Sequence, residues 1–165
     1  MEELIKELKA QNKTLSIIEA TDGVEVSRIF QTLKNRSKMF DSITIASVDS
    51  VKKAIEYTPA NFQSIDQYYK YLTQEIGKKA SDFLGSDYGI AIICTKEVKL
   101  NVENSSMFIC IYDKKTGMAY NCKPKAVNCN DATMPSTITM FIINQLNAIL
   151  KTQKQNPVQK VNRKR

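Results

Sequence analysis

Apolar residues in the first part of the chain repeat at two spacings, one typical of helices and one typical of strands. Residues 2–11 predict a short amphipathic helix, and residues 14–20 (TLSIIEA) predict a strand because they are rich in β-branched side chains. Beyond the turn at Gly23, apolar residues recur at helical spacing to about Asn35. Residues 41–47 (DSITIAS) alternate between apolar and polar, as expected for a second strand.

The middle of the chain predicts two further helices and two further strands. Residues 48–57 continue as a helix, and the strongest helical periodicity starts near Ser64 and ends near Gly85, a typical C-terminal stop. Residues 88–95 (YGIAIICT) are continuously apolar, which predicts a central strand covered on both faces. Residues 105–113 (SSMFICIYD) predict another strand.

The last part predicts a hairpin followed by a helix. Residues 114–117 (KKTG) form the expected turn before a returning strand at 118–122, and Pro135 lies early in the final helix. Helices and strands alternate first and the hairpin comes later, so we expect an α/β fold, a three-layer α/β/α sandwich with a mixed sheet. Residues 1–150 are predicted to be one domain, and residues 151–165 a basic, disordered tail.

The charge of the chain is concentrated in this tail. The 165 residues carry a formal net charge of +7, with 42% hydrophobic and 25% charged residues, which is ordinary for a globular domain. The tail holds six basic residues and no acidic ones, so about +1 remains for residues 1–150. Such an arm can make weak, salt-sensitive contacts with nucleic acid or an acidic partner, or simply aid solubility.

The residue types narrow the chemistry. The chain has four cysteines without C-x-x-C spacing and no histidine, so we expect free thiols, no metal site and no cofactor. Any acid–base chemistry must use lysine, tyrosine, cysteine or carboxylates. No apolar run is long enough to span a bilayer, and the opening residues are acidic and helical and unlike a signal sequence, so we expect a cytoplasmic protein with no membrane contact.

Three segments, in order, resemble motifs of one known family. They are KTLSIIEATDG at 13–23, RSKMFDSITIASVDSVKKAI at 36–55 and SDYGIAIICTKEV at 86–98. Their order and spacing resemble the C-terminal domain of the competence- and damage-inducible CinA family, whose stand-alone members are nicotinamide-nucleotide amidases. The resemblance covers nearly the whole chain to about residue 150 and implies a CinA C-terminal-like fold and self-association into a homo-oligomer.

The resemblance also implies a serine amidase that acts on nicotinamide mononucleotide or a related nucleotide. Ser37 falls on the nucleophilic serine of the family, and Lys52 falls on the lysine that assists it. The substrate-binding positions implied by the same motifs are Glu19, Thr21, Gly23 and Thr95.

Several positions depart from the family motifs. The assisting tyrosine is replaced by Ser47, and Asp22 and Val24 replace a threonine and a glycine in the first turn. In the third segment, Cys94 and Glu97 replace glycines that allow close approach to a ligand. A carboxylate beside a helix start repels a phosphate. We therefore expect a protein that keeps the fold and whose deamidation of nicotinamide mononucleotide is weakened or lost.

Simpler explanations stand beside these assignments. Ser37 and Lys52 can be a helix stop and a solvated lysine, and Asp22 can cap the helix that follows it. Tyr68 and its neighbours on the helix after Ser64 could stack on nucleic acid, although core and rim packing explains them without a ligand. A non-catalytic binding module that uses the basic tail is the alternative function.

Overall fold

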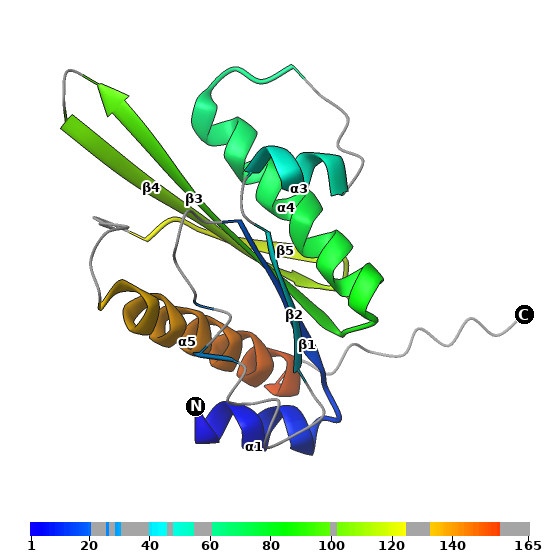
Figure 1. The fold of residues 1–165 in the computed structure, drawn as a ribbon. Helices are drawn as coiled ribbons and strands as arrows, with labels where there is room; N and C mark the ends of the chain where they lie inside the picture. Colours follow the sequence, from blue (N-terminus) through cyan, green and yellow to red (C-terminus); the bar gives the residue numbers. More distant parts are fainter. Residues whose placement is uncertain are drawn as a thin grey trace, which may run out of the picture.

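A mixed sheet with helices on both faces organises the part of the chain that a computed structural model describes (Figure 1). The described residues are 1–20, 26, 29–30, 40–45, 48–54, 61–99, 102–124 and 133–155. Their elements are α1 (Glu2–Ala10), β1 (Leu15–Ala20), β2 (Phe40–Ile45), α3 (Val48–Ala54), α4 (Ile65–Leu84), β3 (Tyr88–Lys99), β4 (Val102–Asp113), β5 (Met118–Cys122) and α5 (Met134–Gln155).

The strands follow the order β2-β1-β3-β4-β5 within the described residues. β1 runs parallel to β2 and β3, with Leu15 opposite both Phe40 and Tyr88. β3, β4 and β5 pair in antiparallel fashion. The predicted mixed sheet with residues 88–95 at its centre is therefore confirmed, and so is the three-layer architecture.

Alternation along the strands divides the core between the two faces of the sheet. On the first face, which we call the α5 face, Ile17, Ile90 and Ile109 pack with apolar residues of α1 and α5. On the opposite face, the α4 face, smaller residues such as Ala91 pack with α3 and α4. Figure 1 shows α1 with α5 on one side of the sheet and α3 with α4 on the other.

The ends of α4 are set by local sequence. The Ser64 hydroxyl accepts a hydrogen bond from the Gln67 amide at 3.1 Å, which satisfies one of the free N–H groups of the first turn. Gly85 ends the helix in the left-handed conformation, with φ of 66°, and its amide donates to the Ser81 carbonyl. Both predicted boundaries are confirmed.

Two predicted boundaries near the third family-like segment are wrong. β3 continues to Lys99, and β4 already begins at Val102, so residues 94–98 are strand rather than a ligand-binding turn. In this hairpin Thr95 lies opposite Ser106. Antiparallel pairing with residues 102–107 of the following strand continues β3 past the end of its apolar run. The outer end of the hairpin extends beyond the helices in Figure 1.

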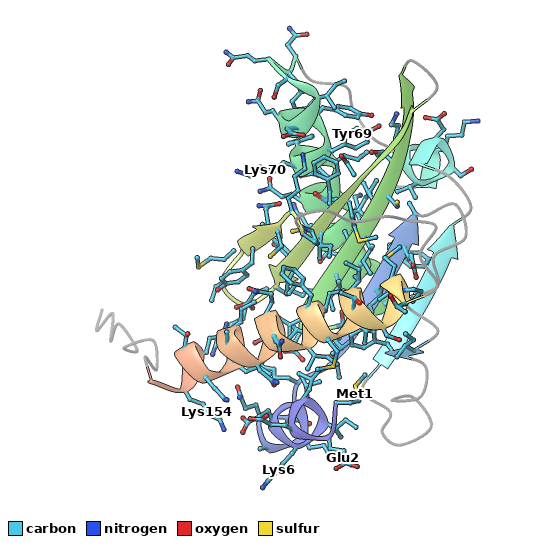
Figure 2. All side chains as sticks on the ribbon, turned by 90° about the vertical axis from the view of Figure 1, so that its left-hand side faces the viewer. Met1, Glu2, Lys6, Tyr69, Lys70 and Lys154 are labelled. Carbon is cyan, nitrogen blue, oxygen red and sulfur yellow. The ribbon has the colours of Figure 1, made fainter. Side chains whose placement is uncertain are left out.

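The final helix also runs beyond residue 150. α5 ends at Gln155, and Lys151 and Lys154 pair with Glu3 and Glu7 of α1 at 3.2 and 2.5 Å. Figure 2 shows Lys154 beside α1. Two of the six basic residues assigned to the tail are therefore helical and ion-paired. Residues 156–165 lie outside the described residues, and the division between domain and tail stays a prediction.

The predicted helix from Gly23 to Asn35 is described only in part. Val26, Ile29 and Phe30 are helical, and Val26 and Phe30 are fully buried in the core of the α5 face. No helix within the described ranges is both long enough and apolar enough to cross a membrane.

Candidate functional site

The described candidate residues lie on different elements. Glu19 is near the C-terminal end of β1, opposite Thr44 of β2, and Lys52 is in α3, which follows β2. Thr95 is in the hairpin of β3 and β4. The candidate nucleophile Ser37 lies outside the described residues, as do Thr21, Gly23, Asp22, Val24 and Ser47. Their predicted roles stay predictions.

Glu19 is a fully buried carboxylate on the α5 face. Its Oε1 accepts a hydrogen bond from the Val26 backbone amide at 2.9 Å. A buried carboxylate needs such partners because its transfer out of water is costly. Glu19 thus connects Val26 to β1 through this hydrogen bond, a structural role that the sequence motif did not predict.

Lys52 lies at the surface of α3 with its ammonium group held by two neighbours. Its Nζ is 3.1 Å from Asp49 Oδ1 and 5.3 Å from the centroid of the Tyr68 ring. A side-chain hydrogen bond with Tyr68 is the largest cause of a raised Lys52 pKa; burial opposes it, and Asp49 adds to it. Both partners favour the charged lysine.

Tyr68 was missed as a partner of Lys52. It is on α4, far from the position where the family motif carries its tyrosine. The only signal in the sequence was the cluster of tyrosines on this helix. Tyr68 also packs edge-to-face on Phe62 and Tyr69, at centroid distances of 5.4 and 5.0 Å. Tyr69 stacks on Phe108 at 5.0 Å, so packing accounts for these tyrosines, as the simpler explanation predicted.

Thr95 and Cys94 lie where the family motif has a glycine-rich turn. Thr95 Oγ1 donates to the Ser106 carbonyl at 3.3 Å, across the hairpin. Cys94 is disulfide-bonded, so the expectation of free thiols is wrong at this position. Cys110 and Cys122 are free, and burial raises the pKa of both thiols. This part of β3 has paired backbone instead of an open loop.

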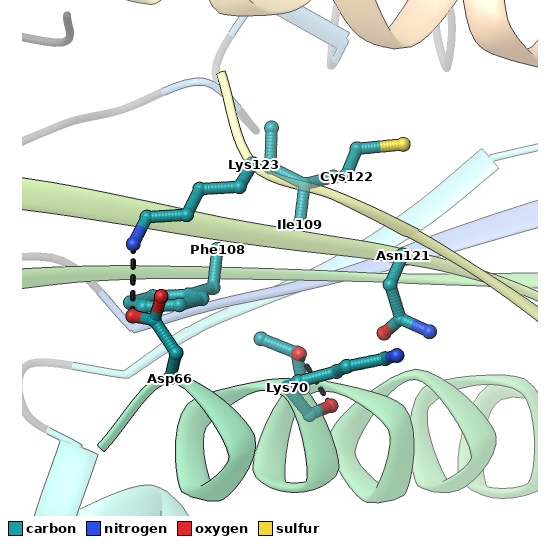
Figure 3. A pocket seen from close by; sticks show the side chains of 8 residues that line it. Asp66, Lys70, Phe108, Ile109, Asn121, Cys122 and Lys123 are labelled. Atoms are coloured by element: carbon teal, nitrogen blue, oxygen red, sulfur yellow. Dashed lines mark hydrogen bonds and ion pairs between the residues drawn. The ribbon is translucent and has the colours of Figure 1, made fainter. Parts of the chain in front are cut away.

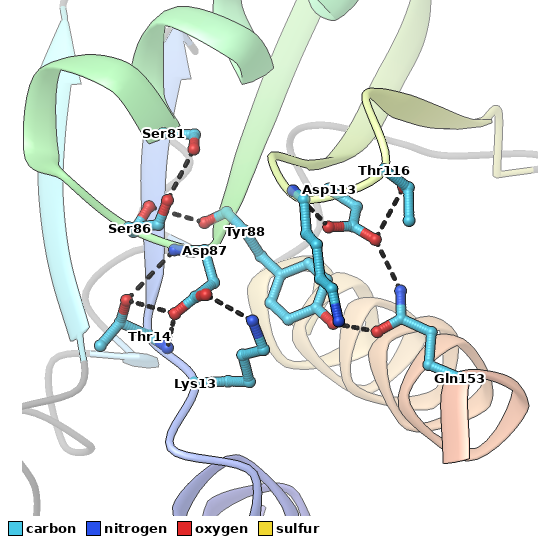
Figure 4. A network of polar contacts seen from close by, with 10 residues as sticks. Lys13, Thr14, Ser81, Ser86, Asp87, Tyr88, Asp113, Thr116 and Gln153 are labelled. Carbon is cyan, nitrogen blue, oxygen red and sulfur yellow. Dashed lines mark hydrogen bonds and ion pairs between the residues drawn. The ribbon is translucent and has the colours of Figure 1, made fainter. Parts of the chain in front are cut away.

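The opposite end of the parallel strands carries a closed polar network (Figure 4). Asp87 accepts from the Thr14 amide and hydroxyl at 3.0 and 3.1 Å, and Lys13 Nζ is 2.5 Å from its other oxygen. Burial would raise the Asp87 pKa, but these partners outweigh it and lower the pKa. The network therefore joins the starts of β1 and β3.

The same network anchors α5 to the sheet. Asp113 is 1% exposed and accepts from the Thr116 hydroxyl at 2.8 Å and from Gln153 Nε2 at 2.6 Å. The Tyr88 hydroxyl donates to Gln153 Oε1 at 2.8 Å, and burial raises the Tyr88 pKa. These groups satisfy one another, so their arrangement is structural.

No cluster of three or more acidic or cysteine side chains suited to a metal ion occurs in the ranges the structure describes. The described polar side chains of the candidate site instead engage backbone groups or neighbouring side chains, as Glu19, Lys52 and Thr95 do.

Comparisons with known proteins identify the fold. The sequence matches no protein-family model and no curated protein. Among solved structures, the competence or damage-inducible protein from Enterobacter asburiae superposes with a TM-score of 0.71 at 15% identity, over 90% of this chain and 94% of that chain. The competence/damage inducible protein CihA from Agrobacterium tumefaciens gives 0.72 at 8% identity, over 90% and 92%.

A CinA superfamily protein from Escherichia coli agrees with these two matches. It superposes with a TM-score of 0.67 at 19% identity, over 89% of this chain and 86% of that chain. Likeness at such low identity concerns the arrangement of helices and strands. The resemblance of the three sequence segments is confirmed at this level: the chain has the α/β fold of the CinA superfamily.

Proposed function

We propose that this chain is a divergent CinA-like protein in which deamidation of nicotinamide mononucleotide is weakened or lost. The observation that carries the proposal is the state of Lys52, whose ammonium is held by Asp49 and Tyr68 with a raised pKa. A lysine that takes a proton from a serine must be neutral when it acts.

The raised pKa works against that role. A lysine of ordinary pKa is neutral in roughly 1 molecule in 2,500 at pH 7, and the Lys52 environment lowers this fraction further. A lysine suited to general-base catalysis is instead desolvated or placed beside another cation. Burial does lower the pKa of Lys52, but the neighbouring phenol and acid outweigh it, and the side chain is still 31% exposed.

The surroundings of the other candidate residues support the same proposal. The Glu19 carboxylate accepts a hydrogen bond from the Val26 amide, and Thr95 lies in a strand paired with β4 instead of in a turn. The substitutions at Asp22 and Glu97 add negative charge where the family motif would receive a nucleotide phosphate. Catalytic groups that act as a unit are strongly non-additive, so the loss of one of them can already remove most of the activity.

The test is ammonia release from nicotinamide mononucleotide by the purified chain, measured beside the Ser37→Ala variant. We expect the two proteins to release ammonia at the same background rate at pH 7. The assay is repeated at rising pH, because a working Lys52 base would become more active toward its raised pKa. Release that Ser37→Ala abolishes would show that the activity is not lost, and such release at the rate of an intact amidase of the family would overturn the proposal.

A second candidate function is binding of nucleic acid or an acidic protein through the basic end of the chain. The supporting observation is the charge of residues 156–165, which hold four basic residues and no acidic ones (Lys160, Arg163, Lys164 and Arg165). Four phosphate contacts would give a slope of about −3 to −4 for log affinity against log salt. Deletion of residues 156–165 should abolish binding; full binding by the truncated chain would contradict this function.

A further inference from the structure

The disulfide bond of Cys94 has no part in the proposed amidase chemistry. Cys94 lies in β3 on the α5 face, is 6% exposed and is disulfide-bonded. The chain has four cysteines, and the other three are Cys110, Cys122 and Cys129. Cys110 and Cys122 are free thiols. The elimination leaves Cys129, which lies outside the described residues, as the partner of Cys94.

The positions of the two free cysteines agree with this elimination. Alternation along β4 puts Cys110 on the α4 face, on the other side of the sheet from the Cys94 side chain. Cys122 shares the α5 face with Cys94 but lies on β5, and β4 separates β5 from β3. Two strand spacings amount to about 9–10 Å, whereas the Cα atoms of a disulfide are about 4.4–6.8 Å apart. Neither thiol can therefore reach Cys94 while the sheet is intact.

The strand that precedes Cys129 ends close to the level of Cys94 along the sheet. Cys122 lies opposite Ile109 of β4, and Cys94 lies opposite Met107, two residues further along β4. β5 runs antiparallel to β4, so the chain that leaves β5 continues toward the level of Met107. It therefore approaches the part of the sheet that holds Cys94.

Lys123 fixes the place where the chain leaves β5. Its Nζ is 2.8 Å from Asp66 Oδ1 and 4.9 Å from the centroid of the Phe108 ring. Figure 3 shows this ion pair beside a groove of about 230 Å³ between α4 and β5, which Asn121 also lines. The connection from β5 to α5 thus starts at a place that contacts with both α4 and β4 define.

This connection is long enough to bring Cys129 to Cys94. It joins Pro124, after β5, to Thr133, before α5. Cys129 is five residues from Pro124 and four from Thr133, so it lies within about 18 Å and about 14 Å of them. Met134, the first residue of α5, belongs to the same buried cluster as Cys94. The connection therefore ends on the face of the sheet where the Cys94 side chain lies.

We propose that Cys94 and Cys129 are a redox-active pair whose disulfide links the connection before α5 to β3. In oxidation by a small-molecule disulfide such as oxidised glutathione, one protein thiolate attacks the reagent, forms a mixed disulfide and releases one glutathione thiolate. The second protein thiolate attacks the mixed disulfide at the protein sulfur and releases the second glutathione thiolate. The pair loses two electrons to the reagent, and the two protons that its thiols lose are taken up by the glutathione thiolates. Dithiothreitol reverses the exchange.

The two free thiols are poorly suited to the same exchange. Burial raises the pKa of Cys110 to about 12 and also raises the pKa of Cys122. The thiolate is the form that attacks a disulfide, so both groups stay protonated and unreactive near neutral pH. Oxidation should therefore join Cys94 to Cys129 and leave the other two cysteines unchanged.

Peptide mapping tests the pairing, because trypsin leaves each cysteine on a separate peptide. The purified chain is treated with oxidised glutathione, alkylated without reduction and digested. We expect residues 80–96 to be linked to residues 126–151, with Cys110 and Cys122 alkylated. A link from residues 80–96 to another peptide, no link at all, or a bond between two chains on a non-reducing gel would overturn the proposal.

Matched variants show what the bond does to the fold. Dithiothreitol should lower the melting temperature of the oxidised chain by about 5–15 °C, because reduction frees a loop of about 35 residues in the unfolded state. Cys129→Ser should melt at the lower temperature with and without the reductant. Cys122→Ser is the control, since Cys122 is half-buried and free, and it should keep both the link and the shift. An equal shift in Cys129→Ser, or no shift in the unmodified chain, would contradict the proposal.

Discussion

The two faces of the sheet are packed in different ways. On the α5 face, long aliphatic side chains from α1, α5 and three strands form one continuous core, and the network of Asp113 and Gln153 closes its end. On the α4 face, the described core is smaller and includes alanines and the aromatic pair Tyr69 and Phe108. The groove beside Asn121 lies on this second face.

The difference arises from one close contact between α4 and β3. Gly77 and Gly89 face each other, and a Cβ atom added to Gly89 would lie 1.9 Å from the Gly77 carbonyl oxygen. The helix therefore touches the backbone of the central strand. Because strands in a sheet twist relative to one another, a straight helix close to β3 separates from the edge strand β5. On the other face, large side chains fill the space between the sheet and α5.

The largest expected effect comes from breaking the close contact on the α4 face. Gly89→Ala places a Cβ against the Gly77 carbonyl and 2.8 Å from the Ser81 amide nitrogen, so backbone must move. We expect the free energy of unfolding to fall by more than about 3 kcal/mol, measured by urea denaturation.

Gly85→Ala is the matched control. Gly85 has φ of 66° and no atom within 4 Å of an added Cβ, so only the backbone conformation is strained, at a cost of about 1–2 kcal/mol. If Gly89→Ala cost no more than Gly85→Ala, the account of the α4 face would be wrong.

A smaller effect is expected from opening the network on the α5 face. Asp113→Ala removes a carboxylate that is 1% exposed and leaves the half-buried Gln153 amide without its acceptor, while the exposed Thr116 hydroxyl can turn to water. We expect a loss of about 2–4 kcal/mol in the same denaturation experiment. Asp82→Ala removes an exposed ion pair with Lys114 and should cost less than about 1 kcal/mol. If the two variants lost the same free energy of unfolding, the hydrogen bonds of Asp113 would not stabilise the fold more than an exposed ion pair does.

The smallest effect concerns the half-exposed end of the network at Asp87. Its pKa is lowered in the folded chain, so it contributes stability above its unfolded value of about 3.9, and that contribution is lost as the pH falls through the lowered pKa. We expect the melting temperature of Asp87→Asn to change less between about pH 5 and pH 2 than that of the unmodified chain. Parallel melting curves for the two proteins across this range would contradict the role of Asp87.

The sequence predicted the ends of helices well where a residue affects its own backbone conformation or caps an amide a few residues away. Ser64 and Gly85 end α4 because a hydroxyl cap and a residue with positive φ work within a few positions. Pro135 lies in the first turn of α5 for a similar reason. The continuous apolar run at residues 88–95 likewise predicted a strand that is buried on both faces of the sheet.

The candidate site was less accessible to such reasoning. The motif match pointed to Lys52, but its partner Tyr68 comes from another helix, and no spacing rule connects them. The strand was predicted only to residue 95, and the family motif has glycines within 94–98, whereas pairing with β4 continues the strand to Lys99. Strand pairing depends on a partner segment and not on the propensity of one segment alone.

The sequence by itself determined which segments are helices and strands, which of their faces are apolar and which known fold they resemble, because these properties follow from spacing and from caps a few residues apart. The tertiary structure alone decided that Glu19 is taken up by a backbone amide, that Lys52 is held as a cation and that Asn121 lines a groove. Each of these contacts joins residues of different helices and strands, which the tertiary structure brings together. Where such a contact is buried, its loss is costly, because a buried polar group without a partner is strongly unfavourable.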